Sequence, residues 1–211
     1  HSTETAMLRV TNNLLTSVGS GSALFLVTLD LTVDFDTVNH TKLLERLKEE
    51  FGVSREALEW ISSYLCDRRQ YVKVGSSTAT TTECFAGVPQ GSVLGPLLFA
   101  AYVAPVSRVI NAHGVHQHSY ADDITLYLGI GTDFQNSDMV VLNCADDVGQ
   151  WFLQNDLLLN ESKSEVIVIG TSSQLRKSVP KSSYLVGAAT IALVDSVKIV
   201  GVTLDNHLSF D

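Results

Sequence analysis

Hydrophobic and polar residues follow one another with two different periods along the chain. Stretches whose apolar residues recur every three or four positions predict amphipathic helices, and short continuous apolar runs predict buried strands. Helices are predicted over residues 5–18, 42–51, 54–65, 97–111 and 136–155. Strands are predicted over residues 24–29, 71–74, 80–85, 117–121, 124–128, 165–169, 185–194 and 197–204. Helices and strands interleave, which indicates an α/β or α+β fold around one sheet.

The pattern also predicts which side of each helix faces the core. The first helix has an irregular apolar face, formed by Ala6, Leu8, Leu14 and Leu15. The second is expected to bury Leu43, Leu44, Leu47 and Phe51. Ser54 can cap the third helix, and residues 172–183 are predicted to be a polar, basic loop.

Composition excludes several classes of protein. The chain has 211 residues, 45% of them hydrophobic, which is enough for one sizeable core. Its longest apolar runs are strand-length, so no membrane span is expected, and no signal peptide is visible. The cysteines Cys66, Cys84 and Cys144 are far apart and odd in number, which fits neither a disulfide framework nor a zinc site. We therefore expect reduced thiols and an intracellular location, nuclear or cytoplasmic.

Acidic residues are concentrated in one part of the chain. The formal net charge is −9, and no Lys or Arg occurs between Arg108 and Lys163. This balance argues against a free-standing nucleic-acid binder, because contacts to phosphates need Lys and Arg. It suits a site that works through bound Mg²⁺, since an acidic segment otherwise repels a nucleic-acid backbone.

Two neighbouring carboxylates stand between two predicted strands, in the segment Tyr120-Ala121-Asp122-Asp123. At a hairpin tip they repel one another unless a cation neutralises them, although Asp is also common in ordinary turns. Asp30, at the end of the buried run 24–29, favours the first interpretation over a simple turn, although in isolation it could equally be a helix cap or a strand terminator. If its strand lies beside the hairpin, three carboxylates converge, as two Mg²⁺ ions about 3.5–4 Å apart require.

A loop rich in glycine and proline occupies residues 87–96, Gly-Val-Pro-Gln-Gly-Ser-Val-Leu-Gly-Pro. This composition fixes a loop and lets another backbone approach it closely. Gln90 could there hydrogen-bond a base or a sugar. The alternative is a rigid turn before a helix, for which a single Gln framed by Pro and Gly is an unusual design.

Together these segments resemble the palm region of reverse transcriptases of non-LTR (LINE-type) retrotransposons. Residues 29–40 resemble the first palm motif of that family, and residues 87–99 resemble the second. The segment 120–123 matches the Tyr-x-Asp-Asp box, and residues 157–166 resemble the motif that follows it. The resemblance covers nearly the whole chain with its motifs in order. It implies an α+β polymerase palm, an antiparallel sheet packed on helices, with partial fingers.

The resemblance implies the ligands of a metal centre. Asp30, Asp122 and Asp123 would be the catalytic residues and would bind two Mg²⁺ ions, for which Mn²⁺ could substitute. The carbonyl of Leu31 would assist them.

The resemblance also implies substrate contacts. Phe35 would lie under the sugar of the incoming nucleotide and select dNTPs over NTPs, although a core aromatic is the competing interpretation. Gln90 and Gly91 would line the template and nucleotide side, and Tyr120 would support the primer end. Lys163 would lie near the leaving phosphate, with a solvated surface lysine as the alternative.

The activity implied is RNA-directed DNA synthesis, in which a DNA primer is extended on an RNA template with dNTPs. Residues 1–22 would be the end of the fingers, 23–195 the palm, and 196–211 the start of the connection to the thumb. The chain has no initiator Met, so we interpret it as a piece of a longer polypeptide. The missing fingers and thumb of that polypeptide would then be its partners.

One segment departs from the family pattern. Val33 and Asp34 stand where small residues are usual, and Asp34 adds a negative charge where the triphosphate approaches. Asn39 stands where an Asp is frequent. A catalytically silent nucleic-acid-binding remnant is therefore an alternative function, which the intact aspartates oppose. Another palm-type enzyme, such as a nucleotide cyclase, is disfavoured by Phe35 and the Pro-Gln-Gly loop.

Overall fold

The computed structural model describes residues 3–32, 35–130, 134–160, 162–177, 181–186 and 189–209. The helices are α1 (Thr3–Gly19), α2 (His40–Glu49), α3 (Arg55–Leu65), α4 (Gly95–Val103), α5 (Val106–Ala112), α6 (Phe134–Gln154) and α7 (Ser172–Lys177). The longer strands are β1 (Ala23–Leu29), β7 (His116–Tyr120), β8 (Asp123–Ile130), β10 (Glu165–Ile169), β11 (Ser183–Val186), β12 (Ala189–Ala192), β13 (Ser196–Ile199) and β14 (Val202–Asp205). The two-residue strands are β2 (Leu31–Thr32), β3 (Arg69–Gln70), β4 (Lys73–Val74), β5 (Ser77–Thr78), β6 (Thr82–Glu83) and β9 (Leu158–Leu159).

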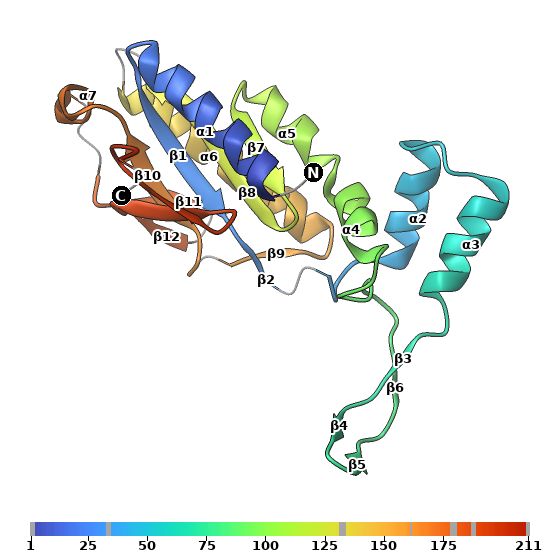
Figure 1. Ribbon diagram of the computed structural model, residues 1–211. Coiled ribbons are helices and arrows are strands. Elements are labelled where there is room, and N and C mark those ends of the chain that lie inside the picture. Colours follow the sequence, from blue (N-terminus) through green and yellow to red (C-terminus); the bar gives the residue numbers. More distant parts are fainter. Residues whose placement is uncertain are drawn as a thin grey trace. The chain divides into compact units, whose positions relative to one another are not determined.

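These elements form two compact units, and Figure 1 labels most of the helices and strands that belong to them. The sheet unit comprises His1–Thr32, Val106–Gln154 and Leu158–Asp211. The helical unit comprises Val33–Pro105 and Asn155–Leu157. Each candidate site residue belongs to one of the two, so each unit is treated by itself.

The sheet unit is built on four antiparallel strands in the order β10-β1-β8-β7 (Figure 1). In β1, every residue except Thr28 is buried. This is why the sequence of this strand is a continuous apolar run rather than an alternating one. The predicted strand over residues 24–29 is thus confirmed, and it is central.

Both faces of this sheet are covered. Leu24 and Leu26 share a core cluster with Val10 of α1 and Val197 of β13. Because successive side chains of a strand point to opposite faces, Phe25 lies on the other side, where its ring meets that of Tyr184 edge-on with centroids 5.0 Å apart. Helix α6 contacts β1, β8 and β11. The expected α+β fold, an antiparallel sheet packed on helices, is confirmed.

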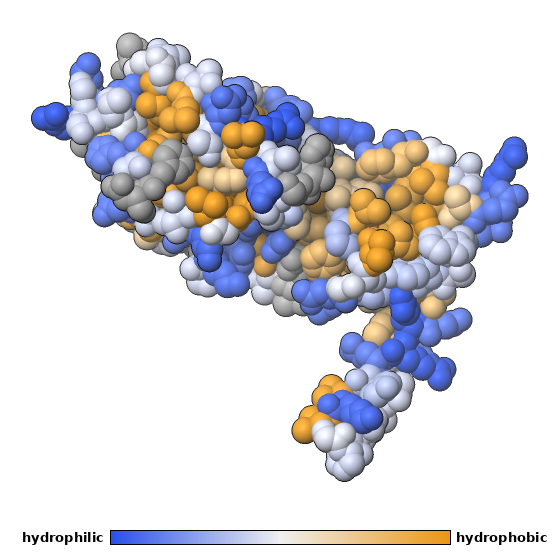
Figure 2. All heavy atoms as spheres, viewed as in Figure 1, coloured by the Kyte–Doolittle hydropathy of each residue, from blue (hydrophilic) through white to orange (hydrophobic). Residues whose placement is uncertain are grey.

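The helical unit contains α2, α3, α4 and a thin arm built from β3 to β6 (Figure 1). The predicted hairpin over residues 71–85 exists, but as two short ladders, β3 with β6 and β4 with β5. All residues of these strands are exposed. Apolar side chains show at the end of the arm in Figure 2, where Val74 is 74% exposed.

Several predictions about helices were wrong in detail. The apolar residues Leu8 and Leu15 are 71% and 49% exposed, and Val10 is buried in their place. Phe51 is 50% exposed because α2 ends before it. Ser54 does precede α3 as its cap residue, but its side chain forms no capping hydrogen bond.

The remaining differences between the predicted and the observed elements come from an interrupted helix and from short elements. The helix predicted over residues 97–111 is divided into α4 and α5 at Pro105, which has no N–H to continue the first helix. The loop predicted over residues 172–183 begins with the short helix α7. The strands predicted over residues 185–194 and 197–204 are hairpins, β11 with β12 and β13 with β14. No helix in the described ranges has the length and apolarity to cross a membrane.

Candidate active site

The hairpin between β7 and β8 presents two carboxylates, Asp122 in its two-residue loop and Asp123 at the start of β8. Tyr120 lies opposite Asp123 in the ladder, and Ala121 and Asp122 join them. Ala121 has a φ of 54°, a left-handed conformation that glycine adopts more easily. Such a backbone costs about 1–3 kcal/mol.

Asp30 comes to the same place because β1 is the neighbour of β8. Leu29 lies opposite Ile124, so the next residue of the chain reaches the level of the hairpin tip. Carboxylate oxygens of Asp30, Asp122 and Asp123 all lie within 4.8 Å of one another. The convergence that the sequence left conditional is therefore present in the fold.

Asp30 is held by its backbone and is incompletely paired by its side chain. Its carbonyl accepts a hydrogen bond from the Asn160 amide at 2.8 Å, and its amide donates to Ser164 Oγ at 3.4 Å. Its buried Oδ2 has no hydrogen-bond partner, and Lys163 Nζ is 3.7 Å from that atom. Sequence reasoning gave Asn160 and Ser164 no role, although both lie in the motif-like segment 157–166 beside Lys163, and Ser164 is buried.

The electrostatics of this cluster fit a divalent cation. Three half-buried carboxylates lie together, and the ammonium group of Lys163, whose side chain is 68% exposed, lies 3.7 Å from the Asp30 carboxylate. Like charges this close are mutually unfavourable unless a cation lies between them, and carboxylate oxygens are the preferred ligands of Mg²⁺. Among the residues that the structure describes, no second group of three acidic, His or Cys side chains meets so closely.

Leu31 and Tyr120 flank the cluster on the sheet unit. Leu31 starts β2, pairs with Leu159 of β9 and is buried. Tyr120 is the last residue of β7 and is half-buried. The structure thus gathers Asp30, Leu31, Tyr120, Asp122, Asp123 and Lys163 in one unit.

The other predicted substrate residues lie in the helical unit. The Val88 amide donates to the Phe35 carbonyl at 2.7 Å, which ties the Phe35 segment to the Pro-Gln-Gly loop. The Phe35 ring stacks on Phe99 with centroids 4.8 Å apart. Gly87 is required at this junction, because a Cβ there would come 2.8 Å from the Asp36 carbonyl oxygen.

Gln90 and Gly91 are exposed on the loop before α4. Gln90 lines an open hollow of about 550 Å³ together with Arg68 and Arg69 at the base of the arm. Ser92 Oγ accepts a hydrogen bond from the amide of Gly95, so the loop is fixed where the helix begins. Val33 and Asp34, which depart from the family pattern, lie outside the described residues.

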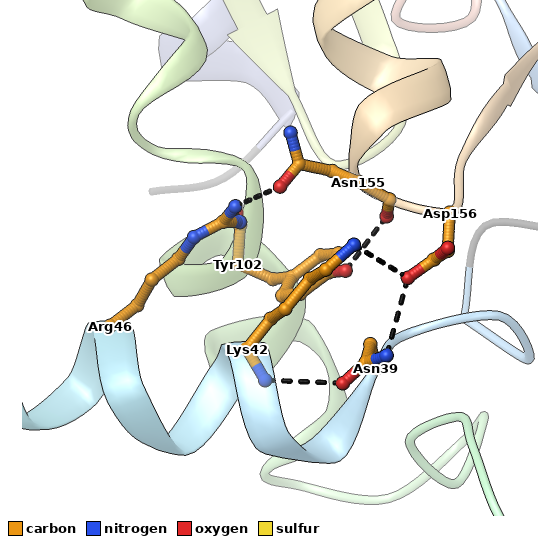
Figure 3. A network of polar contacts seen from close by, with 6 residues as sticks. All are labelled: Asn39, Lys42, Arg46, Tyr102, Asn155 and Asp156. Carbon is orange, nitrogen blue, oxygen red and sulfur yellow. Dashed lines mark hydrogen bonds and ion pairs between the residues drawn. The ribbon is translucent and has the colours of Figure 1, made fainter.

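Sequence reasoning also missed a polar network inside the helical unit (Figure 3). Asn39 caps α2 by accepting from the Lys42 amide at 3.1 Å, and its side-chain amide donates to Asp156 at 3.3 Å. Lys42 Nζ lies 2.8 Å from the same Asp156 oxygen. The hydrogen bond from Lys42 lowers the pKa of Asp156.

The second half of the network surrounds Arg46 (Figure 3). Its guanidinium donates to the Tyr102 carbonyl and to Asn155 Oδ1, and it stacks over the Tyr102 ring at 4.5 Å. The Tyr102 hydroxyl donates to the Asn155 carbonyl at 2.7 Å. Burial lowers the pKa of Arg46 and raises that of Tyr102. These contacts attach the turn after α6 to α2 and α4.

Comparison with known proteins identifies the family. The sequence profile of the reverse transcriptase (RNA-dependent DNA polymerase) family matches residues 5–204, and the chain belongs to this family. Within it, the chain is related over its whole length to the enzymes of non-LTR retrotransposons. It is 28% identical over 212 residues to the probable RNA-directed DNA polymerase from transposon X-element of Drosophila melanogaster, covering 100% of this chain and 22% of that protein.

Two further relatives support the relationship to retrotransposon polymerases. The probable RNA-directed DNA polymerase from transposon BS of Drosophila melanogaster is 34% identical over 131 residues, covering 60% of this chain and 14% of that protein. A retrovirus-related Pol polyprotein from type-1 retrotransposable element R2 of Popillia japonica is 28% identical over 172 residues, covering 77% of this chain and 27% of that protein. The chain thus spans between 14% and 27% of the length of these three relatives.

Solved structures support the fold alone. An apo telomerase from Candida tropicalis, truncated from its C-terminal domain, matches with a TM-score of 0.59 at 15% identity, covering 100% of this chain and 39% of that one. A telomerase from Candida albicans, in complex with a fragment of telomeric RNA, matches with a TM-score of 0.58 at 16% identity, covering 99% and 36%.

Proposed function

We propose that the chain is the catalytic palm region of an RNA-directed DNA polymerase, which extends a DNA primer on an RNA template with dNTPs. One observation carries this proposal: carboxylate oxygens of Asp30, Asp122 and Asp123 lie within 4.8 Å of one another in a chain of the reverse transcriptase family. The sheet supplies rigid support for these groups, because β1 and β8 are adjacent and buried.

Asp30, Asp122 and Asp123 would hold two Mg²⁺ ions, with help from the Leu31 carbonyl, and Mn²⁺ would fit the same oxygen ligands. When bound, such ions favour ionisation of the primer 3′-hydroxyl and stabilise the leaving pyrophosphate. The buried Asp30 Oδ2 supports this assignment, since it accepts no hydrogen bond and its one ion pair, with the exposed Lys163, is long at 3.7 Å.

The chain's own residues orient and balance this site. The Asn160 amide and Ser164 hydroxyl fix the backbone of Asp30, so its carboxylate keeps its direction. Lys163 neutralises part of the excess negative charge and is exposed enough to move toward a departing phosphate and donate a proton to it. Tyr120, at the end of β7, would support the primer terminus.

Phe35, Gln90 and Gly91 would form the nucleotide and template side. Phe35 has the rigidity that a sugar-selecting side chain needs, because its ring stacks on Phe99 and its carbonyl is bonded to Val88. Gln90 is exposed and free to meet a base. By the same resemblance, the end of the fingers would lie in residues 1–22, the palm in 23–195 and the start of the thumb connection in 196–211. The missing fingers and thumb would supply the grip on the template and primer.

The test is primer extension by residues 1–211 grafted between the fingers and thumb of an active relative, on an RNA template with Mg²⁺. Extension that disappears in Asp123→Asn would support the proposal. Absence of extension that Asp34→Ala restores would indicate a decayed polymerase with intact metal ligands. Absence of extension in every folded version would contradict the proposal and favour a catalytically silent remnant.

A further inference from the structure

A hollow of about 310 Å³ lies on the sheet unit, and none of the three carboxylates lines it. It is formed by the first half of α1 and by β7, and is lined by Thr5, Ala6, Arg9, His118, Ser119 and Tyr120. None of these residues except Tyr120 belongs to the proposed catalytic site.

The register of β7 explains why His118 faces this hollow. Side chains of His116, His118 and Tyr120 share one face of the strand, because successive side chains alternate. On that face the His116 ring stacks on Tyr127 at 5.4 Å, and the Tyr127 hydroxyl accepts from Asn13 of α1 at 3.2 Å. The face that carries His118 is therefore the one that α1 covers.

Arg9 and His118 both line the hollow, and neither the Arg9 guanidinium nor His118 Nε2 has a hydrogen-bond partner among the described residues. His118 Nε2 is buried and has no hydrogen-bond partner among the described residues. Arg9 is exposed and forms no hydrogen bond or ion pair with a described residue. In a chain of net charge −9, where acidic partners are abundant, an uncommitted arginine beside a buried imidazole nitrogen points to an anionic ligand.

We propose that this hollow binds a phosphate group through the Arg9 guanidinium and His118 Nε2. The planar guanidinium matches two phosphate oxygens, an imidazole N–H can donate to a third, and Thr5 of α1 also lines the hollow. The choice of phosphate over carboxylate rests on the proposed function, whose substrates all carry phosphates. The group could be a phosphodiester of a nucleic-acid strand or a free phosphate.

The protonation state of His118 is compatible with this ligand. Burial, and secondarily the charge of Arg9, lower the pKa of His118, so the ring is neutral in the empty hollow at neutral pH. A neutral imidazole keeps one N–H and one acceptor nitrogen, and the tautomer with the proton on Nε2 can donate to an oxyanion. Phosphate binding at this site therefore does not require a second proton on His118.

The hollow lies on the strand that leads into the hairpin of Asp122 and Asp123, and this position suggests a role in placing a bound strand. β7 continues through Tyr120 into the hairpin that bears Asp122 and Asp123. A phosphate bound by Arg9 and His118 would attach a strand to the same rigid sheet that carries the carboxylates. The contribution would be positioning rather than chemistry.

The experiment measures binding without metal and without polymerisation, so a failed polymerase would leave it interpretable. The ring signals of His118 are followed by NMR while inorganic phosphate, and separately a short single-stranded DNA, is added to the whole chain. The variants are Arg9→Met and His118→Gln, and the matched control is Arg176→Met, an exposed arginine of α7.

We expect the His118 signals to shift with DNA, with phosphate or with both. A shift with phosphate alone identifies a free phosphate as the ligand, and a shift with DNA alone identifies a phosphodiester. Arg9→Met should weaken binding about tenfold or more and, for DNA, reduce the salt-dependence slope by about 1. His118→Gln, which keeps an N–H donor, should have the smaller effect, and Arg176→Met should have none. The proposal is overturned if neither ligand moves the His118 signals, or if Arg9→Met and Arg176→Met weaken binding equally.

Discussion

Two clusters of charged and polar side chains in this molecule are organised in opposite ways. In the sheet unit, three carboxylates converge, and the exposed Lys163 lies 3.7 Å from one of them, Asp30. In the helical unit, the network around Arg46 and Asp156 pairs each of these charges with hydrogen-bonding groups (Figure 3). The first cluster gathers like charges, whereas the second pairs charged groups with partners and attaches a turn to two helices. The first cluster therefore has the arrangement that a divalent cation would stabilise, and the second is complete without one.

The largest effect should come from removing one carboxylate of the first cluster. In the grafted polymerase, Asp30→Asn should lower primer extension by about a thousandfold or more, because one of the three carboxylates proposed to hold the metal ions is lost. Stability without metal should be retained, since the change removes charge repulsion. The control Asp195→Asn alters an exposed carboxylate of the same unit and should leave extension unchanged. Primer extension by Asp30→Asn at the parent rate would contradict a catalytic role for the carboxylate cluster.

The converse effect is expected in the second cluster. Arg46→Met should lower the free energy of unfolding by about 2 kcal/mol, because Asn155 Oδ1 and the Tyr102 carbonyl lose their donor. Urea denaturation measures this change. Metal binding by the carboxylates of the sheet unit should be unaffected. Lys48→Met, on the exposed side of the same helix, is the control, and an equal loss of stability there would contradict this account.

A smaller effect on the free energy of unfolding is expected at Asp122, and its sign should depend on whether Mg²⁺ is present. Asp122→Asn should raise the free energy of unfolding by about 0.5–1 kcal/mol in EDTA, because it relieves repulsion between half-buried carboxylates. In excess Mg²⁺ the parent chain should become the more stable of the two, since it alone keeps the full set of ligands. Parallel urea titrations with and without Mg²⁺ test this reversal. The same ranking under both conditions would show that the cluster holds no ion.

The smallest effect concerns pH. Lys42 lowers the pKa of Asp156, so this pair contributes stability above the ordinary Asp pKa and loses it as pH falls through the lowered value. Because Asp156 is half exposed, the contribution should be at most about 0.5 kcal/mol. Urea denaturation from neutral to acidic pH should show a shallower loss in Asp156→Asn than in the parent chain. Identical pH profiles would show that the pair adds nothing.

The sequence predicted the elements of the functional cluster better than their assembly. The run 24–29 and the pair Asp122-Asp123 were recognisable because they are local patterns. Their meeting depended on β1 lying next to β8, a pairing between segments about a hundred residues apart that local patterns do not determine. The family resemblance supplied that order, and the fold agrees with it.

The balanced network was beyond prediction for a related reason. Arg46 and Asn155 are far apart in the sequence, and neither belongs to a recognisable motif. The predicted helix over residues 42–51 includes Lys42, but its partner Asp156 comes from the turn after α6. Periodicity also failed for Phe51, because it cannot show where a helix ends relative to the core.

Cation binding by the chain tests the central claim most directly, and titration with Mn²⁺ followed by electron paramagnetic resonance measures it without any need for polymerase activity. The account predicts that the parent chain and Asp195→Asn take up Mn²⁺ alike, that Mg²⁺ displaces it, and that Asp123→Asn loses this binding. Equal Mn²⁺ binding by the parent chain and Asp123→Asn would contradict the claim that the three converging carboxylates form a metal centre.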